Sequence, residues 1–131
     1  MELFIGIFGL LIALATFYYS FFKKSDDELN HLKAIFRATQ TLSISVQESI
    51  EEYANKSDSW DKLMFSDVTF RDYLIHMKDS YKENLSEGVY TKLSTMKFSK
   101  ANIQSMTNSI EQQFSELQKI KAGIKIKLNQ L

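Results

Sequence analysis

The chain contains no cysteine and no proline, and it has only four glycines and two histidines. The absence of cysteine excludes disulfide bonds, thiolate zinc sites and a cysteine nucleophile. Two histidines are too few for a multi-histidine metal centre within one chain. Because proline is absent and glycine is scarce, few residues interrupt helices, and the sequence predicts long helices.

An excess of charge of one sign is also missing. The chain has 16 basic and 16 acidic side chains, so its formal net charge is zero. We therefore expect no strong nucleic-acid binding. The sequence contains no glycine-rich nucleotide-binding motif, no GxSxG motif and no HExxH motif, and we predict neither a cofactor nor a metal ion. A length of 131 residues with 44% hydrophobic side chains fits one domain of ordinary size.

Charged residues are absent from the segment 3–22, which reads LFIGIFGLLIALATFYYSFF. A helix of about 20 apolar residues spans the roughly 30 Å hydrocarbon core of a bilayer. The segment is too long for a cleaved signal peptide, and no positive charge precedes it. We therefore predict an uncleaved transmembrane anchor over residues 1–24. Lys23 and Lys24 follow the span, so the positive-inside rule predicts an outside N-terminus and a cytoplasmic domain over residues 25–131.

Small residues recur every three or four positions along this predicted span. They are Gly6, Gly9, Ala13, Thr16 and Ser20. Such a stripe lets transmembrane helices approach closely, and threonine and serine can hydrogen-bond across the contact. The stripe predicts self-association, although a span that contains glycine and alanine can also show this spacing by chance. In a ring of spans, this face would pack against a neighbour or line a lumen.

The remainder of the chain predicts an all-α fold, an antiparallel bundle of three to four helices. Ser25 and Glu28 form a capping box at the start of a long amphipathic helix that reaches Tyr53. A polar break follows at residues 55–59. The sequence leaves the structure of residues 60–65 open.

Three further helices are predicted after this break. Ser66 and Asp67 are expected to cap a helix that ends near Gly88, and residues 89–96 are expected to form a short helix. Ser99 is expected to cap the last helix, whose apolar stripe continues to the end of the chain. Gly123 either ends or bends that helix. The lysines near its C-terminus are expected to form a solvated face.

One segment of the predicted bundle has a known chemical use. Arg71, Asp72 and His76 match the R-x4-6-H pattern of HEPN domains, which are small all-helical bundles, many of them dimeric ribonucleases. A histidine can move a proton at neutral pH, and an arginine can hold a phosphate. Two copies from two subunits could cleave RNA through its own 2′-hydroxyl.

The same residues also have a structural interpretation. On a straight helix, positions i and i+5 lie about 140° apart, so catalysis would need a partner chain or a broken helix. Arg71 would then pair with Asp67 or Asp72, and His76 would lie at the edge of a core. We expect the other histidine and arginine, His31 and Arg37, at the surface or in an interface.

A single N-terminal span followed by a small helical bundle with a degenerate HEPN motif resembles the small membrane accessory proteins of type VI-B CRISPR systems. The resemblance rests on the order of these parts and on Arg71, Asp72 and His76. It implies a HEPN-like fold that acts as a scaffold more than as an enzyme. It also implies a homo-oligomeric ring, an octamer, in the bacterial inner membrane. Such a pore would permeabilise the membrane when an RNA-guided RNA-targeting nuclease has found phage RNA.

Two other classes of function remain open from the sequence. One is a membrane-tethered HEPN ribonuclease or toxin, which would need His76 for RNA cleavage. The other is a membrane-anchored helical adaptor that forms no pore and stays monomeric or dimeric in detergent.

Overall fold

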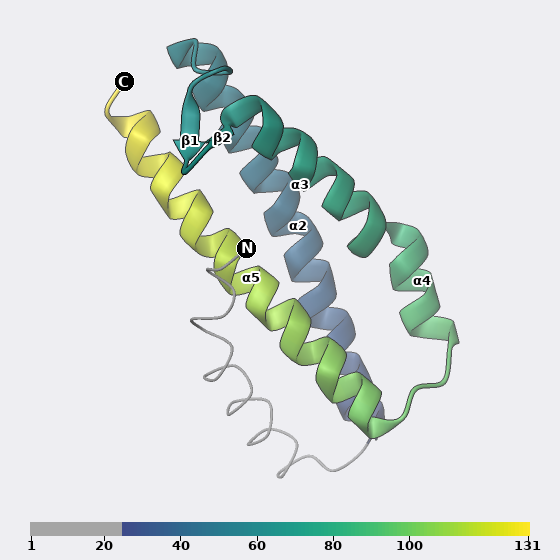
Figure 1. Ribbon diagram of the computed structural model, residues 1–131. Helices are drawn as coiled ribbons and strands as arrows, with labels where there is room; N and C mark the ends of the chain where they lie inside the picture. Colours follow the sequence, from purple (N-terminus) through teal and green to yellow (C-terminus); the bar gives the residue numbers. More distant parts are fainter. Residues whose placement is uncertain (1–24) are drawn as a thin grey trace.

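The computed structural model describes residues 25–131, and this part of the chain is mostly helical, as the sequence predicts (Figure 1). The elements in chain order are α2 (Ser25–Ser57), β1 (Leu63–Phe65), β2 (Val68–Thr69), α3 (Phe70–Asn84), α4 (Glu87–Thr95) and α5 (Lys100–Asn129). Within residues 25–131, no helix combines the length and the hydropathy needed to cross a membrane. The predicted anchor at residues 1–24 lies outside the described residues, and so does the side chain of the predicted cap Ser25.

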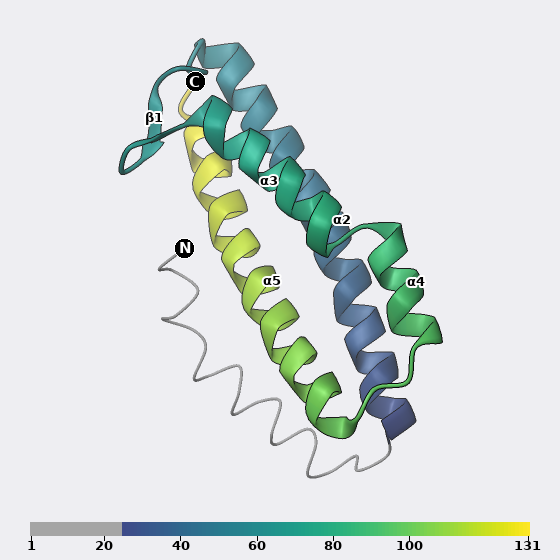
Figure 2. The ribbon, with the colours of Figure 1, turned by 45° about the vertical axis from the view of Figure 1, so that its right-hand side comes forward.

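The two long helices, α2 and α5, run in the same direction. His31 Nε2 lies 3.0 Å from Glu111 Oε1, and further along both helices Lys121 hydrogen-bonds to Ser45. Helices α3 and α4 follow one another in the opposite direction beside α2, so the chain runs up, down and up (Figures 1 and 2). The predicted antiparallel arrangement is therefore correct for α3 and α4 against α2, while the most extensive helix contact, between α2 and α5, is parallel.

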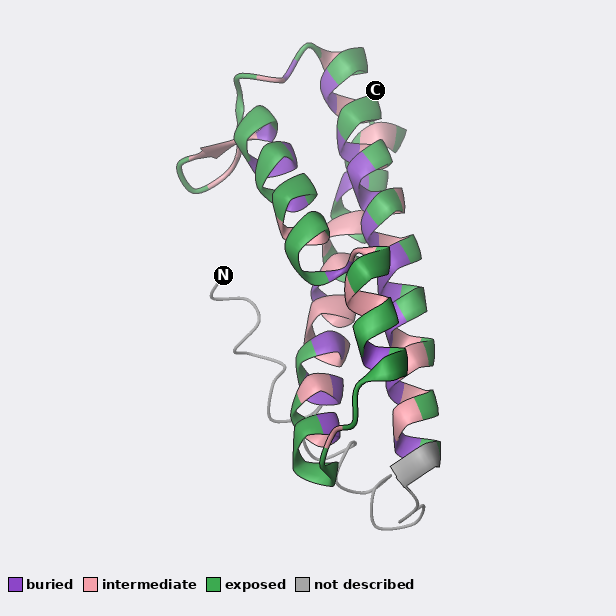
Figure 3. Ribbon diagram, turned by 90° about the vertical axis from the view of Figure 1, so that its right-hand side faces the viewer, coloured by how far each residue is buried: buried purple, intermediate pink, exposed green. Residues whose placement is uncertain are grey.

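Apolar side chains form two separate core clusters along α2, and Figure 3 shows the buried residues on the inward faces of the long helices. One cluster, near the C-terminal ends of α2 and α5, contains Val46, Ile50, Ala54, Phe70, Tyr73, Leu74, Met77 and Ile124. The other, near their N-terminal ends, contains Leu32, Phe36, Leu85, Leu93, Ile103 and Ile110. Between the clusters, the buried face of α2 is polar, with Thr39, Gln40 and Ser43 almost inaccessible to solvent.

The open question of residues 60–65 is answered by a short hairpin. Leu63 pairs with Thr69 and Phe65 with Val68, and Ser66 in the turn adopts a left-handed φ of 52°. The prediction that Ser66 and Asp67 cap the next helix was wrong, because both lie in the turn between the strands. Thr69 is the N-cap of α3, and its hydroxyl accepts a hydrogen bond from the backbone N–H of Asp72 at 3.1 Å.

The later helix boundaries agree in part with the sequence. Ser99 caps α5, as predicted, and accepts from the N–H of Asn102 at 3.2 Å. The predicted short helix is α4, which Ser86 caps. The preceding helix ends at Asn84, not near Gly88, because Gly88 lies inside α4. Gly123 does not end α5, which continues to Asn129.

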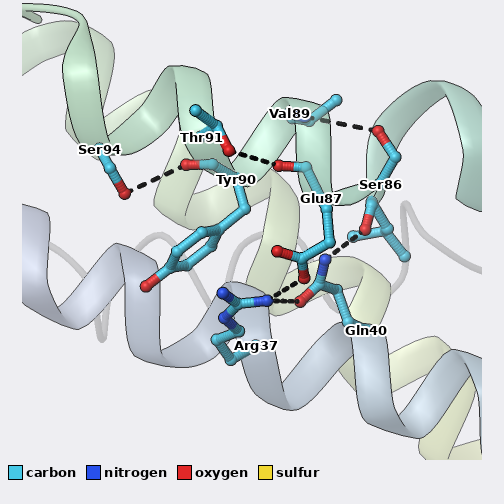
Figure 4. A network of polar contacts seen from close by, with 9 residues as sticks. Arg37, Gln40, Ser86, Glu87, Val89, Tyr90, Thr91 and Ser94 are labelled. Atoms are coloured by element: carbon cyan, nitrogen blue, oxygen red, sulfur yellow. Dashed lines mark hydrogen bonds and ion pairs between the residues drawn. The ribbon is translucent and has the colours of Figure 1, made fainter.

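Helix α4 is held on α2 by a polar network around Arg37 (Figure 4). The guanidinium of Arg37 pairs with the Glu87 carboxylate, donates to Gln40 Oε1 at 3.1 Å, and lies 3.6 Å from the centroid of the Tyr90 ring. Gln40 Nε2 donates in turn to the carbonyl oxygen of Leu85 at 2.6 Å. Arg37 is exposed and bridges two helices of one chain, which agrees with its expected place at the surface.

Candidate functional site

Arg71 lies in the first turn of α3 and faces the segment that precedes the hairpin. Its Nε donates to Asp61 Oδ1 at 3.2 Å, and its guanidinium lies 5.6 Å from the centroid of the Trp60 ring. The expected partners, Asp67 and Asp72, were wrong, because the hairpin folds back and brings Asp61 to the start of α3. Arg71 thus joins the start of α3 to the segment leading into β1, although both members of the pair are largely exposed.

Asp72 is an acidic residue in the first turn of α3, where its charge complements the positive end of the helix dipole. His76 is exposed on the same helix and lies at a cleft that Arg71 does not line. Because α3 is a continuous helix from Phe70 to Asn84, the i and i+5 positions stay about 140° apart. The structure therefore does not bring Arg71 and His76 together within one chain.

The exposure of His76 predicts a small effect of its removal on folding. We expect His76→Ala to change the free energy of unfolding by less than about 0.5 kcal/mol, as for most surface substitutions. Chemical denaturation of the wild type and the variant measures the difference. Leu74→Ala, a truncation on the same helix at a position only 5% exposed, is the control for a folding defect and should cost about 2–5 kcal/mol. A His76→Ala protein as unstable as the control would contradict the surface placement.

A cleft of about 470 Å³ lies between α3 and α5, over the polar middle of α2. We call it the α3–α5 cleft. On the side of α3 it is lined by Tyr73, His76, Met77, Ser80, Tyr81, Asn84 and Leu85. On the side of α5 it is lined by Ser109, Gln112, Gln113, Glu116, Leu117 and Ile120, and α2 contributes Ser43. Its size falls within the range of clefts that bind small molecules.

Glu116 is the most unusual residue of the α3–α5 cleft. Glu116 is only 1% exposed, and neither of its carboxylate oxygens has a hydrogen-bond partner within the described chain. Burial raises the pKa of Glu116, and the positive charge of Lys119 on the same helix opposes this rise only in part. A buried carboxylate without a partner is costly, so Glu116 is a position where the fold gives up stability.

Tyr73 lies across the cleft from α5 and is 5% exposed. Burial raises the pKa of Tyr73, and the nearby charge of Glu116 raises it further. The phenol therefore stays neutral throughout the physiological pH range and can act as a hydrogen-bond donor.

The buried polar side chains of α2 on either side of Ser43 have partners, in contrast to Glu116. Thr39 Oγ1 donates to the carbonyl oxygen of Ile35 at 2.7 Å, and Gln47 Nε2 donates to Ser43 Oγ at 3.2 Å. The carboxylate of Glu28 and the side-chain oxygen of Asn108 are also buried without a partner, but neither residue lines this cleft. Sequence reasoning missed Glu116. A signal was present, because Gln112, Glu116 and Ile120 recur every four residues on one side of α5.

Metal chemistry finds no support in the part of the chain that the structure describes. From residue 25 to residue 131, no group of three or more histidine, aspartate or glutamate side chains is placed to hold a metal ion.

A comparison of the chain with models of protein families, with curated proteins and with solved structures finds no match. The chemistry of the site therefore has to be argued from its own residues.

Proposed function

We propose that this protein is a membrane-anchored homo-oligomer that forms a pore in the bacterial inner membrane. The observation that carries the proposal is the uncharged segment 3–22 with its stripe of small residues, followed at once by Lys23 and Lys24. A single span cannot enclose a conducting path, whereas a ring of spans that meet through small residues can. The ring is proposed to be an octamer, with the N-terminus in the periplasm and residues 25–131 in the cytoplasm.

The helical body supports this proposal through its connection to the predicted span. Helix α2 begins at Ser25, directly after the two lysines, and extends over 33 residues, or about 50 Å. Neither glycine nor proline occurs between residues 10 and 87, so the sequence carries no signal for a flexible linker between the predicted span and the body. A body joined so directly could hold neighbouring spans in register.

The place of the protein in phage defence is part of the same proposal and rests on the resemblance to the type VI-B accessory proteins. An RNA-guided RNA-targeting nuclease would sense the phage RNA, and this chain would permeabilise the membrane. The absence of net charge favours such a division of labour, because a small neutral body has little means to bind RNA by itself. The HEPN-like bundle would then serve as a scaffold, in line with the separation of Arg71 from His76.

The membrane potential of cells provides the test. Cells that carry this protein, the partner nuclease and a target RNA are expected to depolarise, while cells that lack any one of the three keep their potential. An unchanged potential during full protection from phage would remove the pore. If the pure protein cleaves RNA and His76→Ala abolishes the cleavage, the result would instead support a membrane-tethered ribonuclease. A stable monomer in detergent would support an adaptor.

The stripe of small residues makes a sharper prediction for assembly. Replacing Ala13 by phenylalanine is expected to weaken the association of the spans by about tenfold, because a bulky side chain prevents close approach. The mass of the full chain in mild detergent, measured across concentrations, reports the change. Ala15→Phe introduces the same side chain off the stripe and is the matched control. Equal association of the two variants would contradict a contact through this face.

A further inference from the structure

We infer that the α3–α5 cleft is a binding site for a small organic cation, an alkylammonium of the polyamine class, whose positive charge pairs with Glu116. This inference is independent of the proposed pore, because it rests only on residues of the helical body. Its starting point is the buried carboxylate of Glu116, which lines the cleft and has no hydrogen-bond partner within residues 25–131. A cation that enters the cleft would supply the partner that this part of the chain does not provide.

The charge of the lining decides the sign of the ligand. Among the residues that line the cleft there is no lysine and no arginine, and Glu116 is the one carboxylate. An anion such as a nucleotide phosphate would therefore meet negative charge without any fixed positive charge to balance it. The amides of Gln112, Gln113 and Asn84 and the hydroxyls of Ser43 and Ser80 are neutral, and they can accept hydrogen bonds from an ammonium group.

The apolar part of the lining argues for an organic cation and against a metal ion. The rings of Tyr73 and Tyr81, with Met77 and Leu117, offer surfaces for methylene groups, and aromatic faces attract ammonium groups. Hard divalent cations prefer several oxygen ligands of which more than one is a carboxylate. Within the described chain, no group of three acidic or histidine side chains is placed to hold a metal ion, at this cleft or elsewhere. A volume of about 470 Å³ accommodates a ligand with several methylene groups.

The protonation of Glu116 links binding to pH. Burial raises the pKa of Glu116 and so disfavours its carboxylate form in the empty cleft, whereas a bound cation favours the carboxylate. Binding therefore lowers the pKa of Glu116, and affinity is expected to increase as the pH rises through the raised pKa of the empty site. The ionisable residues that line the cleft beside Glu116 are Tyr73, His76 and Tyr81 of α3, while Ser43 of α2 carries no charge. On its own helix, the charge of Lys119 acts on Glu116.

Isothermal titration calorimetry of the full chain in detergent tests the inference with spermidine and cadaverine as probes. Both are expected to bind, whereas 1,5-pentanediol, which has the hydrocarbon length of cadaverine without its charge, is not. Glu116→Gln is expected to lower the affinity by at least about tenfold, because it removes the negative charge and keeps the size of the side chain. Glu48→Gln, at an exposed position on α2 that does not line the cleft, is the matched control and should leave affinity unchanged.

A second variant guards against a folding defect in Glu116→Gln. Ser109 is exposed at the edge of the cleft, so Ser109→Trp should fold and obstruct entry, with a loss of binding as large as in Glu116→Gln. Equal binding of spermidine by the wild type and by Glu116→Gln would overturn the inference. Failure of both amines to bind the wild type would do so too. A weaker oligomer in Glu116→Gln, with no amine binding to the wild type, would also overturn it and would point to a lysine side chain of a second copy as the partner of Glu116.

Discussion

Phe36→Ala is expected to lower the free energy of unfolding of the helical body by about 3–5 kcal/mol. Phe36 is only 2% exposed and is the largest side chain of the core cluster near the N-terminal end of α2. Its ring lies 5.8 Å from that of Tyr90, so it also supports the contact between α2 and α4. Since whole domains are stable by about 5–15 kcal/mol, one truncation removes a large part of the total.

Urea denaturation followed by circular dichroism measures this loss. Phe98→Ala provides the control, because Phe98 is only partly buried against the same cluster from the segment between α4 and α5. It should cost clearly less than Phe36→Ala, and Phe36→Leu should also be milder because most of the volume is kept. If the two alanine variants were equally stable, the cluster around Phe36 would not carry the stability assigned to it.

The second large effect concerns the dependence of stability on pH. Burial raises the pKa of Glu116 in the folded state above the ordinary value of 4.5 that it has in the unfolded chain. Between these two pKa values the folded state binds more protons, so the contribution of Glu116 to stability is largest below pH 4.5. This contribution falls as the pH rises through the folded-state value. Above that value the folded protein carries the full cost of a buried, unpaired charge.

Glu116→Met removes this cost with a side chain of similar size. We expect the variant to gain on the order of 1–3 kcal/mol in the free energy of unfolding at pH 8 and to lose the corresponding pH dependence. Denaturation midpoints from pH 4 to pH 8 measure both effects. Glu48→Met, at an exposed position, should stay within about 0.5 kcal/mol of the wild type. A wild-type stability that rises steadily over this range would contradict the buried, unpaired state of Glu116.

The long helices could be predicted because their apolar residues recur with one period over many turns. The apolar stripe predicted for α2 repeats every three or four residues. Four of its members are buried in the structure, namely Leu32, Phe36, Val46 and Ile50. The serine before α5 could be recognised by its chemistry, since a hydroxyl at Ser99 can accept from an N–H of the first turn. The parallel contact of α2 with α5 could not be predicted from these patterns, because an apolar stripe does not show which other helix covers it or in which direction that helix runs.

The hairpin was missed because its strands are shorter than any recognisable alternation. Three residues pair with two, and the turn requires a left-handed serine where glycine or asparagine would be the usual signal. Ser66 and Asp67 are residue types that suit both a helix cap and a turn. The pairing of Leu63 with Thr69 places Ser66 and Asp67 in a turn and not at a helix cap, and this pairing cannot be recognised from the local sequence.

The motif residues could be found by pattern, whereas the cleft could not. Arg71 and His76 have the spacing of a catalytic pair, but their separation around α3 depends on that helix being continuous. Glu116 was overlooked because an acidic residue on an amphipathic helix normally faces water. The tertiary structure shows instead that Glu116 is only 1% exposed and lines a cleft between α3 and α5.

The parallel contact between α2 and α5 has a consequence for the synthesis of the chain. Of the described helices, α2 is made before the others, and its main packing partner, α5, is made after them. At about 5–20 residues per second, completing the chain after Ser57 takes on the order of 4–15 s. Over that interval α5 cannot yet cover residues such as Val46 and Ile50. Until α5 has been made, α3 and α4 are the described helices that can shield α2.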